Sequence, residues 1–182
     1  MTEIENRTFD EIAVGDRAEV ARVLRREDIE LFATVSGDLN PAHLDEDYAN
    51  AGRFHRVIAH GMWSGAVISS LLGTRLPGPG TLYLGQSLQF LYPVSIGDTI
   101  RFSVTVRTKA EKRHVTLDCK AENQDGQAVV AGEALVIAPA EKVRRPLPHL
   151  PEVILHHDGD QKTVAGGALD PQHFETYQIA RA

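Results

Sequence analysis

Cysteine is almost missing from the sequence, since Cys119 is the only one among 182 residues. A single thiol cannot form an internal disulfide or a CxxC pair, which fits a reducing compartment. The first residues, Met1 to Arg7, lack the basic and then apolar regions of a signal peptide. No apolar run reaches the roughly 20 residues that a membrane-spanning helix needs. We therefore expect a soluble, cytoplasmic protein with no membrane association.

An excess of positive charge is also missing. The chain has 19 Lys and Arg against 25 Asp and Glu, which gives a net charge of −6. A negative protein is a poor partner for nucleic acid, so nucleic-acid binding is not expected. The length and the 42% hydrophobic content are typical of one globular domain. We place that domain at residues 1–138 and expect a tail or linker at 139–182, where residues 141–151 are basic and rich in proline.

Residues 61–74 contain no charged side chain at all. A helix that is apolar on every face has no solvent side, so this segment should be buried all round. The second half of the chain predicts strands near 81–92, 99–107, 114–121 and 127–137, where apolar and polar residues alternate. This alternation places Cys119 in the core. We expect an α+β fold in which a curved antiparallel sheet wraps a central helix; an ordinary core helix of another α+β domain is the alternative.

One short run carries candidate chemistry, Asp38-Leu39-Asn40-Pro41-Ala42-His43. Pro41 fixes its own φ and keeps Asn40 out of helical geometry, so Asp38 and His43 need not diverge as they would on a helix. A carboxylate and an imidazole a few ångströms apart can hold one water and move its protons. Asn40 could brace the loop by hydrogen bonds to the main chain. The alternative is an Asx-turn beside a surface histidine.

The start of the apolar helix is a second candidate. First-turn N–H groups have no partner within a helix and lie at its positive end. Gly61 offers such an N–H without a side chain, so it could bind a carbonyl oxygen that becomes an enolate. His43, His55 and His60 fit no standard zinc spacing, so no metal is expected. Arg144 and Arg145 either meet phosphate groups or form a solvated basic run.

Three motifs occur in order: Asp-x-Asn-Pro-x-His at 38–43, His-Gly-Met at 60–62, and Pro-Gly-x-Gly-x-x-Tyr-Leu-Gly-Gln at 77–86. Together they resemble the MaoC-like, (R)-specific enoyl-CoA hydratases, which are hot-dog-fold proteins, over about residues 9–138. Within that family the chain is most similar to the hydratase part of bifunctional enoyl-CoA hydratase/phosphate acetyltransferase proteins, a likeness to which 138–146 adds. The transferase activity is not carried over, because the sequence leaves no room for that domain.

The resemblance implies a lyase of fatty acid metabolism that adds water reversibly to trans-2-enoyl-CoA and gives the (R)-3-hydroxyacyl-CoA, without metal or organic cofactor. Asp38 and His43 would hold the water, with Asp38 favoured as base and His43 as proton donor to C2. The Gly61 N–H would bind the thioester oxygen, and Asn40 would support the loop. It also implies at least a homodimer, in which the edge strands of two sheets pair.

Further substrate contacts are expected from Tyr48, Trp63 and Leu84, whose packing would set the depth of the acyl pocket. Gln86 either lines the acyl channel or bonds main chain at a bulge near Gly85. Two rival functions remain. A hot-dog thioesterase often carries a carboxylate on its central helix, which 61–74 lacks. A non-catalytic acyl-CoA-binding module would not need Asp38 and His43.

Overall fold

The computed structural model describes residues 3–157, 160–167 and 179–180. The first half contains most of the helix: β1 (Glu3–Glu5), the 3₁₀ helix η1 (Phe9–Glu11), β2 (Arg17–Val23), α1 (Arg26–Ser36), α2 (Pro41–Leu44), α3 (Glu46–Ala51) and α4 (Gly61–Thr74). The second half is mostly strand: β3 (Leu82–Phe90), β4 (Thr99–Lys109), η2 (Glu111–Arg113), β5 (His114–Glu122), β6 (Ala128–Ile137), β7 (Arg144–Pro146), β8 (Leu150–His157), β9 (Asp160–Gly167) and β10 (Ile179–Ala180). Within the described residues no helix is long and apolar enough to cross a membrane.

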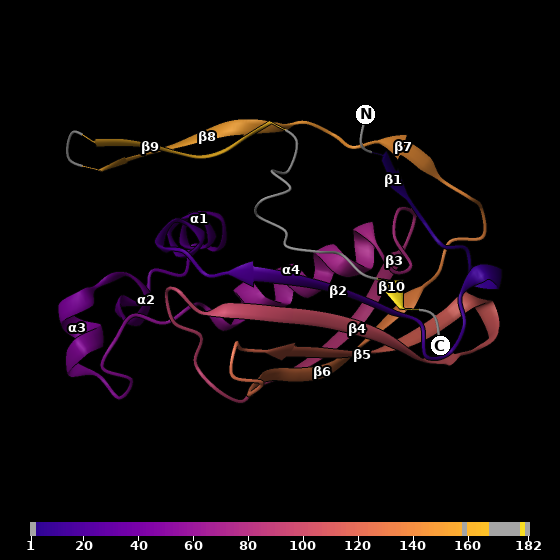
Figure 1. Ribbon diagram of the computed structural model, residues 1–182, viewed down its shortest axis with the longest axis horizontal. Coiled ribbons are helices and arrows are strands. Elements are labelled where there is room, and N and C mark those ends of the chain that lie inside the picture. Colours follow the sequence, from indigo (N-terminus) through magenta and orange to yellow (C-terminus); the bar gives the residue numbers. More distant parts are fainter. Residues whose placement is uncertain (1–2, 158–159, 168–178, 181–182) are drawn as a thin grey trace.

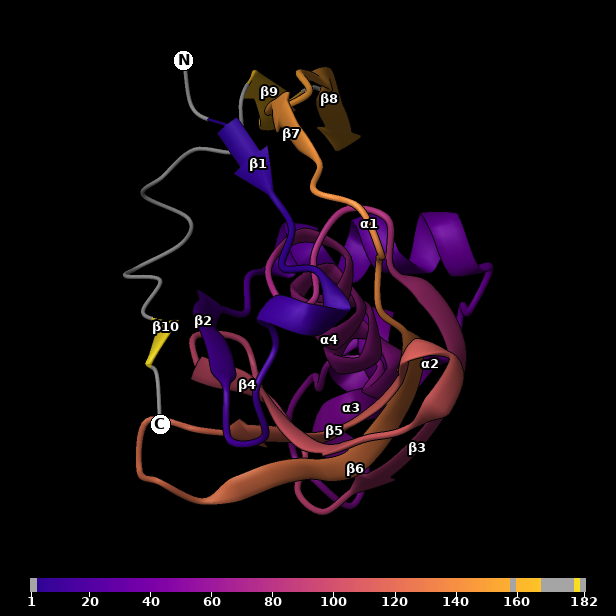
Figure 2. The same ribbon diagram turned by 90° about the vertical axis from the view of Figure 1, so that its right-hand side faces the viewer.

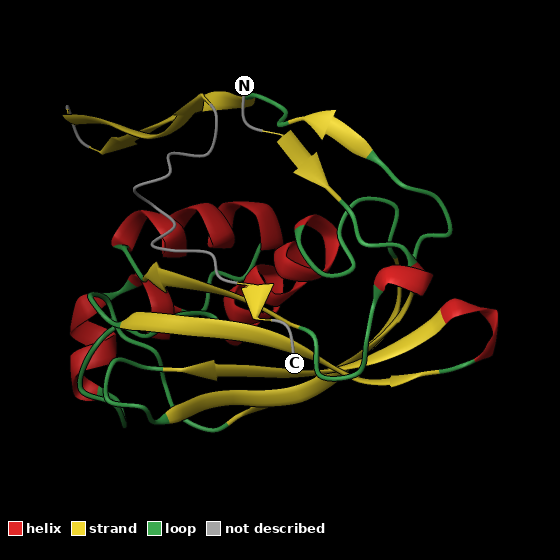
Figure 3. Ribbon diagram, turned by 45° about the vertical axis from the view of Figure 1, so that its right-hand side comes forward, coloured by secondary structure: helices red, strands yellow, loops and turns green. Residues whose placement is uncertain are grey.

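The main sheet is antiparallel, with strand order β10-β2-β4-β5-β6-β3 (Figure 1). It curves around α4, as the end-on view in Figure 2 shows. The longer helices α1 and α4 lie on one side of the sheet (Figure 3). This arrangement confirms the predicted hot-dog architecture of a curved sheet around a central helix.

The core lies between α4 and the inward side chains of β4, β5 and β6. Period-two alternation in these strands places every second apolar residue against the helix. Trp63 of α4 meets Phe102 of β4 edge-on, with 5.7 Å between ring centroids. Cys119 is fully buried there, and burial raises the pKa of its thiol to about 11, so the thiol stays protonated at neutral pH. The expectation of a core thiol is confirmed.

One side of α4 is open, which contradicts the prediction that this helix is buried all round. Met62 is 55% exposed, and Ala66 and Ser69 are exposed beside it, at spacings of four and three residues. These three residues form the open face of α4. The reason is geometric: one curved sheet covers only part of a helix, and the apolar composition of 61–74 does not say which body covers the remainder.

β3 is an edge strand of the sheet and is largely exposed. Its pairing with β6 shifts register between Tyr83 and Gly85, which confirms the bulge predicted near Gly85. Beyond the bulge the two main chains come close at Gly132 of β6. A Cβ added to Gly132 would lie 2.0 Å from the main-chain oxygen of Ser87, so this position requires glycine.

The described residues after 138 include several strands. β7 pairs antiparallel with β1, and the buried Asn6 joins them to the domain. Its Nδ2 donates to the main-chain oxygens of Pro79 (3.0 Å) and Glu141 (2.8 Å), and its Oδ1 accepts from the Val143 N–H (3.0 Å). β8 and β9 then form a two-stranded antiparallel hairpin. The predicted tail therefore contains strands and begins by packing on the N-terminal segment. Residues 158–159, 168–178 and 181–182 of this tail lie outside the described residues.

The basic run at 144–145 also has protein partners. Arg144 Nε donates to a Glu5 carboxylate oxygen at 2.8 Å, and Arg145 Nη1 donates to the Arg144 main-chain oxygen at 3.0 Å. The contact between Arg144 and Glu5 joins β7 to β1, whereas the one between Arg145 and Arg144 lies within β7. Solvent screens an exposed ion pair of this kind, so the buried hydrogen bonds of Asn6 contribute more to the junction.

Candidate active site

The loop that carries Asp38 is shaped by local signals at both ends. Gly37 ends α1 in the left-handed conformation, with φ 74° and its N–H donating to the Ala33 oxygen at 2.8 Å. Asn40 caps α2, because its Oδ1 accepts from the Ala42 N–H at 3.1 Å, and Pro41 occupies the first helical position. The predicted bracing of the loop by Asn40 is therefore present. Asp38 lies between these two fixed points and is exposed.

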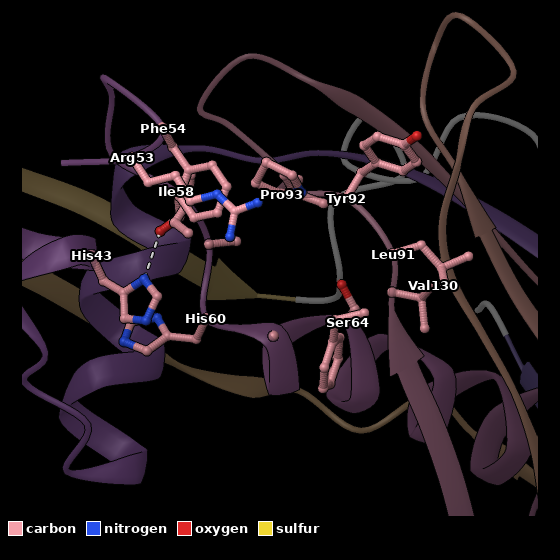
Figure 4. A pocket seen from close by; sticks show the side chains of 14 residues that line it. His43, Arg53, Phe54, Ile58, His60, Ser64, Leu91, Tyr92, Pro93 and Val130 are labelled. Atoms are coloured by element: carbon pink, nitrogen blue, oxygen red, sulfur yellow. Dashed lines mark hydrogen bonds between the residues drawn. The ribbon is translucent and has the colours of Figure 1, made fainter. Parts of the chain in front are cut away.

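His43 turns its imidazole toward Asp38 from α2. Its Nδ1 lies 2.8 Å from the Ile58 main-chain oxygen (Figure 4). A carbonyl oxygen only accepts, so Nδ1 carries the proton and Nε2 holds the lone pair of the neutral ring. One Asp38 carboxylate oxygen and one His43 ring nitrogen lie within 4.8 Å. A water 2.8 Å from each of two groups spans roughly 4.6 Å, so a water fits between them.

His60 completes this cluster, directly before α4. It is only 2% exposed, and its ring lies on that of His43 with 4.0 Å between centroids and 36° between planes. Its Nε2 lies 3.0 Å from the Asp38 main-chain oxygen, so Nε2 carries the proton. Burial lowers the pKa of His60, and the nearby His43 lowers it further, against a smaller opposing effect of the Asp38 hydrogen bond. His60 is therefore neutral near pH 7.

Sequence reasoning gave His60 no role beyond packing, although His-Gly-Met was one of the three motifs. No local signal identifies its hydrogen-bond partner, because Asp38 lies 22 positions earlier in the chain.

Gly61 is the first residue of α4, and its N–H has no partner within the helix. It does not have a positive φ, so glycine is not required there by backbone conformation. A Cβ at this position would lie 3.1 Å from two ring carbons of Phe90. The glycine keeps open the space in front of the helix N-terminus.

A pocket of about 430 Å³ is lined by three of these residues, His43, His60 and Gly61, whereas Asp38 is not part of its lining. One wall is the end of β3 with the residues after it, and the other is the approach to α4. In Figure 4 the two imidazoles lie together at one end of the pocket, and Ser64 points toward it from α4. The lining residues are His43, Arg53, Phe54, Ile58, Ala59, His60, Gly61, Ser64, Phe90, Leu91, Tyr92, Pro93, Val94 and Val130.

Four of the predicted substrate contacts do not line this pocket: Tyr48, Leu84, Gln86 and Trp63. Tyr48 is 56% exposed on α3, and Leu84 lies exposed at the bulge of β3. Gln86, also on β3, donates to the adjacent Ser87 oxygen at 2.8 Å, as expected of a residue that bonds main chain near the bulge.

Trp63 departs most clearly from its predicted role. It is 5% exposed and packs against Phe102, with the Arg22 guanidinium 6.0 Å from its ring centroid. A helix turns about 100° per residue, so Trp63 points into the core while Gly61 and Ser64 face the pocket. The aromatic residues that do line the pocket, Phe54, Phe90 and Tyr92, had no local signal to mark them.

Asp38, His43 and His60 are also the groups nearest to a metal-ligand set, with donor atoms within 4.8 Å. Each imidazole has one nitrogen engaged with a main-chain carbonyl. The two rings lie in contact, tilted by 36° with 4.0 Å between centroids. His55, the third histidine considered from the sequence, instead bonds the Asn50 oxygen at 3.1 Å. The arrangement suits proton transfer better than metal binding.

A curved sheet around one helix, with a carboxylate and an imidazole beside the helix N-terminus, defines a hot-dog protein with an acid–base site. The chain belongs to the MaoC-like family, because the family described as MaoC like domain matches residues 10–126.

Individual relatives agree with this assignment. The chain is 48% identical over 133 residues to an (R)-specific enoyl-CoA hydratase of Rhodospirillum rubrum, covering 72% of this chain and 92% of that protein. It is 40% identical to the enzyme of the same name from Aeromonas caviae, over 70% of this chain and 96% of that one. The unliganded (R)-hydratase PhaJ1 of Pseudomonas aeruginosa superposes with a TM-score of 0.82 at 44% identity, covering 85% of this chain and 100% of that chain.

Proposed function

We propose that the protein is an (R)-specific enoyl-CoA hydratase, which adds water reversibly to a trans-2-enoyl-CoA and forms the (R)-3-hydroxyacyl-CoA. The observation that carries this proposal is the approach of the Asp38 carboxylate and the His43 imidazole to within 4.8 Å of each other, with His43 and the N-terminus of α4 lining the same pocket. The names of the relatives from Rhodospirillum rubrum and Aeromonas caviae support it.

In this mechanism Asp38 and His43 hold the attacking water between them. Asp38 removes a proton from the water as its oxygen bonds to C3, and the electrons of the double bond move to the thioester oxygen. The Gly61 N–H donates to that oxygen, aided by the positive end of α4. The proton taken from the water passes from Asp38 to Nε2 of His43, which delivers it to C2, so that the elements of one water have been added and both groups regain their starting states.

The hydrogen bond of His43 Nδ1 determines which ring nitrogen can deliver the proton. Because Nδ1–H is held by Ile58, a proton for C2 must come from Nε2, so His43 acts as an imidazolium. The Asp38 carboxylate nearby stabilises that positive charge until the proton is transferred. Acid–base catalysis of this kind contributes roughly 10²–10⁴-fold to a rate. No metal or organic cofactor takes part in the scheme.

The proposal includes a homodimer. β3 is an edge strand whose exposed side chains include Leu82, Tyr83 and Leu84, and the open face of α4 is also uncovered. An edge strand with unpaired main-chain groups and apolar side chains is an aggregation hazard unless something pairs with it. A second copy would cover both features. The narrower likeness to bifunctional hydratase/phosphate acetyltransferase proteins, the cytoplasmic location and the domain boundary at 138 remain predictions.

The activity is tested with crotonyl-CoA, whose conjugated thioester absorbs in the ultraviolet. Hydration removes this absorbance without releasing thiol, and the product should be the (R)-3-hydroxy thioester by chiral analysis. Release of free thiol would indicate a thioesterase. Binding without either change would indicate a non-catalytic acyl-CoA-binding module, and both of these outcomes would overturn the proposal.

A further inference from the structure

His60 carries a buried hydrogen-bonding atom that the proposed mechanism does not use. Its Nε2–H is committed to the Asp38 oxygen, while its Nδ1 is buried without a hydrogen-bond partner among the described residues. Buried polar atoms are nearly always partnered, and a buried polar atom without a partner destabilises the fold. An aromatic hydrocarbon ring would fill the same space without that cost. The position therefore holds an imidazole for a reason other than packing.

We propose that His60 is a positioning residue. It holds Asp38 by its main-chain oxygen, and because it stays neutral, His43 is the ring of the pair that gains and loses the catalytic proton. This inference deepens the proposed hydratase function and rests on it.

The first part of the role follows from the loop geometry. Asp38 is exposed and lies in a turn, so few contacts limit where its carboxylate sits. The Asp38 main-chain N–H donates to the Ser36 hydroxyl at 3.2 Å, and its carboxylate accepts from the Asn40 N–H at 3.2 Å, both within the turn itself. The bond to His60 ties the turn to the start of α4, the helix whose N-terminus would hold the thioester. His60 thereby sets the distance between the base and the oxyanion donor.

The second part follows from the surroundings of the His60 ring. His43 stacks on it from α2, Phe32 of α1 lies 5.1 Å away between centroids, and Asp38 accepts from its Nε2. A second proton would have to go on Nδ1, where no acceptor is present to stabilise it. It would also face the imidazolium of His43 at 4.0 Å. The neutral state of His60 leaves His43 as the ring that gains and loses the proton.

Three substitutions separate the hydrogen bond from the ring. His60→Gln can place an amide N–H near the position of Nε2, so it keeps a donor toward Asp38. His60→Asn carries the same group on a shorter side chain that does not reach. His60→Phe keeps an aromatic ring and has no donor.

We expect kcat for crotonyl-CoA to fall roughly 10–100-fold in the Asn and Phe variants, the usual effect of losing a group that orients a functional residue. KM should change little, because His60 acts on the placement of the base. His60→Gln should retain at least about ten times the kcat of His60→Asn, with similar thermal unfolding of the two. A Phe variant as active as wild type, or Gln and Asn variants of equal kcat, would overturn the proposal.

A measurement on the unmodified protein covers the case in which the variants do not fold. Nitrogen-15 NMR of the histidine rings should show His60 as the neutral tautomer protonated at Nε2 at pH 7, and its ring should gain a second proton only at a lower pH than an ordinary histidine does. An Nδ1–H tautomer or a charged His60 at pH 7 would contradict the assignment. This readout does not depend on activity, whereas inactivity of the wild-type protein toward crotonyl-CoA would count against the hydratase function itself.

Discussion

Replacing Gly61 by valine tests whether the main chain at the start of α4 binds the thioester oxygen. The first added atom, Cβ, would lie 3.1 Å from ring carbons of Phe90, where ordinary contacts are about 3.4–4 Å. Phe90 is 50% exposed and can move outward by the few tenths of an ångström required. The two methyl groups then occupy the space in front of the N–H, so hydration should fall by at least roughly 10²–10³-fold, the cost of losing one oxyanion donor.

The fold should survive the change. Overpacking costs about 1–3 kcal/mol in a closed core, and the mobility of the half-exposed Phe90 places this site at the low end, near 1 kcal/mol. Because Gly61 does not have a positive φ, valine adds no backbone strain there. Replacing glycine also restricts the unfolded chain, which returns about 0.4–1 kcal/mol. The expected change in Tm is therefore no more than about 2–4 °C for a chain of this size.

Crotonyl-CoA hydration and thermal unfolding, measured on the same preparations, decide the matter. Gly73→Val serves as the matched control, since it lies in the same helix and a Cβ there would have nothing within 4 Å. The Gly73→Val protein should keep the hydration activity and the sedimentation coefficient of wild type. A fully active Gly61→Val protein would refute the oxyanion role. If the variant is inactive and melts far below wild type, the loss could be due to misfolding. Gly61→Ala should then restore the fold and still reduce hydration.

Three further predictions concern the acid–base pair, the edge strand and the close approach of β3 to β6. Asp38→Asn and His43→Ala should each lower hydration at least roughly 10²–10³-fold without loss of fold, and near-normal turnover in either variant would remove that residue from the mechanism. Sedimentation at micromolar protein should show at least a dimer of the 20.0 kDa chain, so a lone monomer would contradict the pairing proposed for β3. Gly132→Ala should destabilise the protein by 1–3 kcal/mol or more, about the cost of overpacking, because its Cβ would lie 2.0 Å from the Ser87 oxygen. Gly85→Ala, which meets nothing within 4 Å, is its control in a thermal or denaturant unfolding series, and equal stability of the two would refute the account.

Local features of the chain were predictable because their causes act over a few residues. The alternation along 99–107 and 114–121 specifies strands with one buried face, and Gly126 ends the turn between β5 and β6 with its N–H on the Asn123 oxygen. Gly37 and the cap at Asn40 shape the loop that carries Asp38 from within. Such signals also made the three motifs recognisable, and through them the fold and the hydratase family.

The tertiary structure alone decided which distant groups meet. His60 reaches Asp38 across 22 positions, and β7 pairs with β1 from the opposite end of the chain. Trp63 turned into the core although it lies two residues from Gly61, because the sheet covers that side of α4 and leaves Met62 open. Periodicity, capping and turn chemistry specify how each segment folds, but the partner of each face is set by packing between segments that no local signal connects.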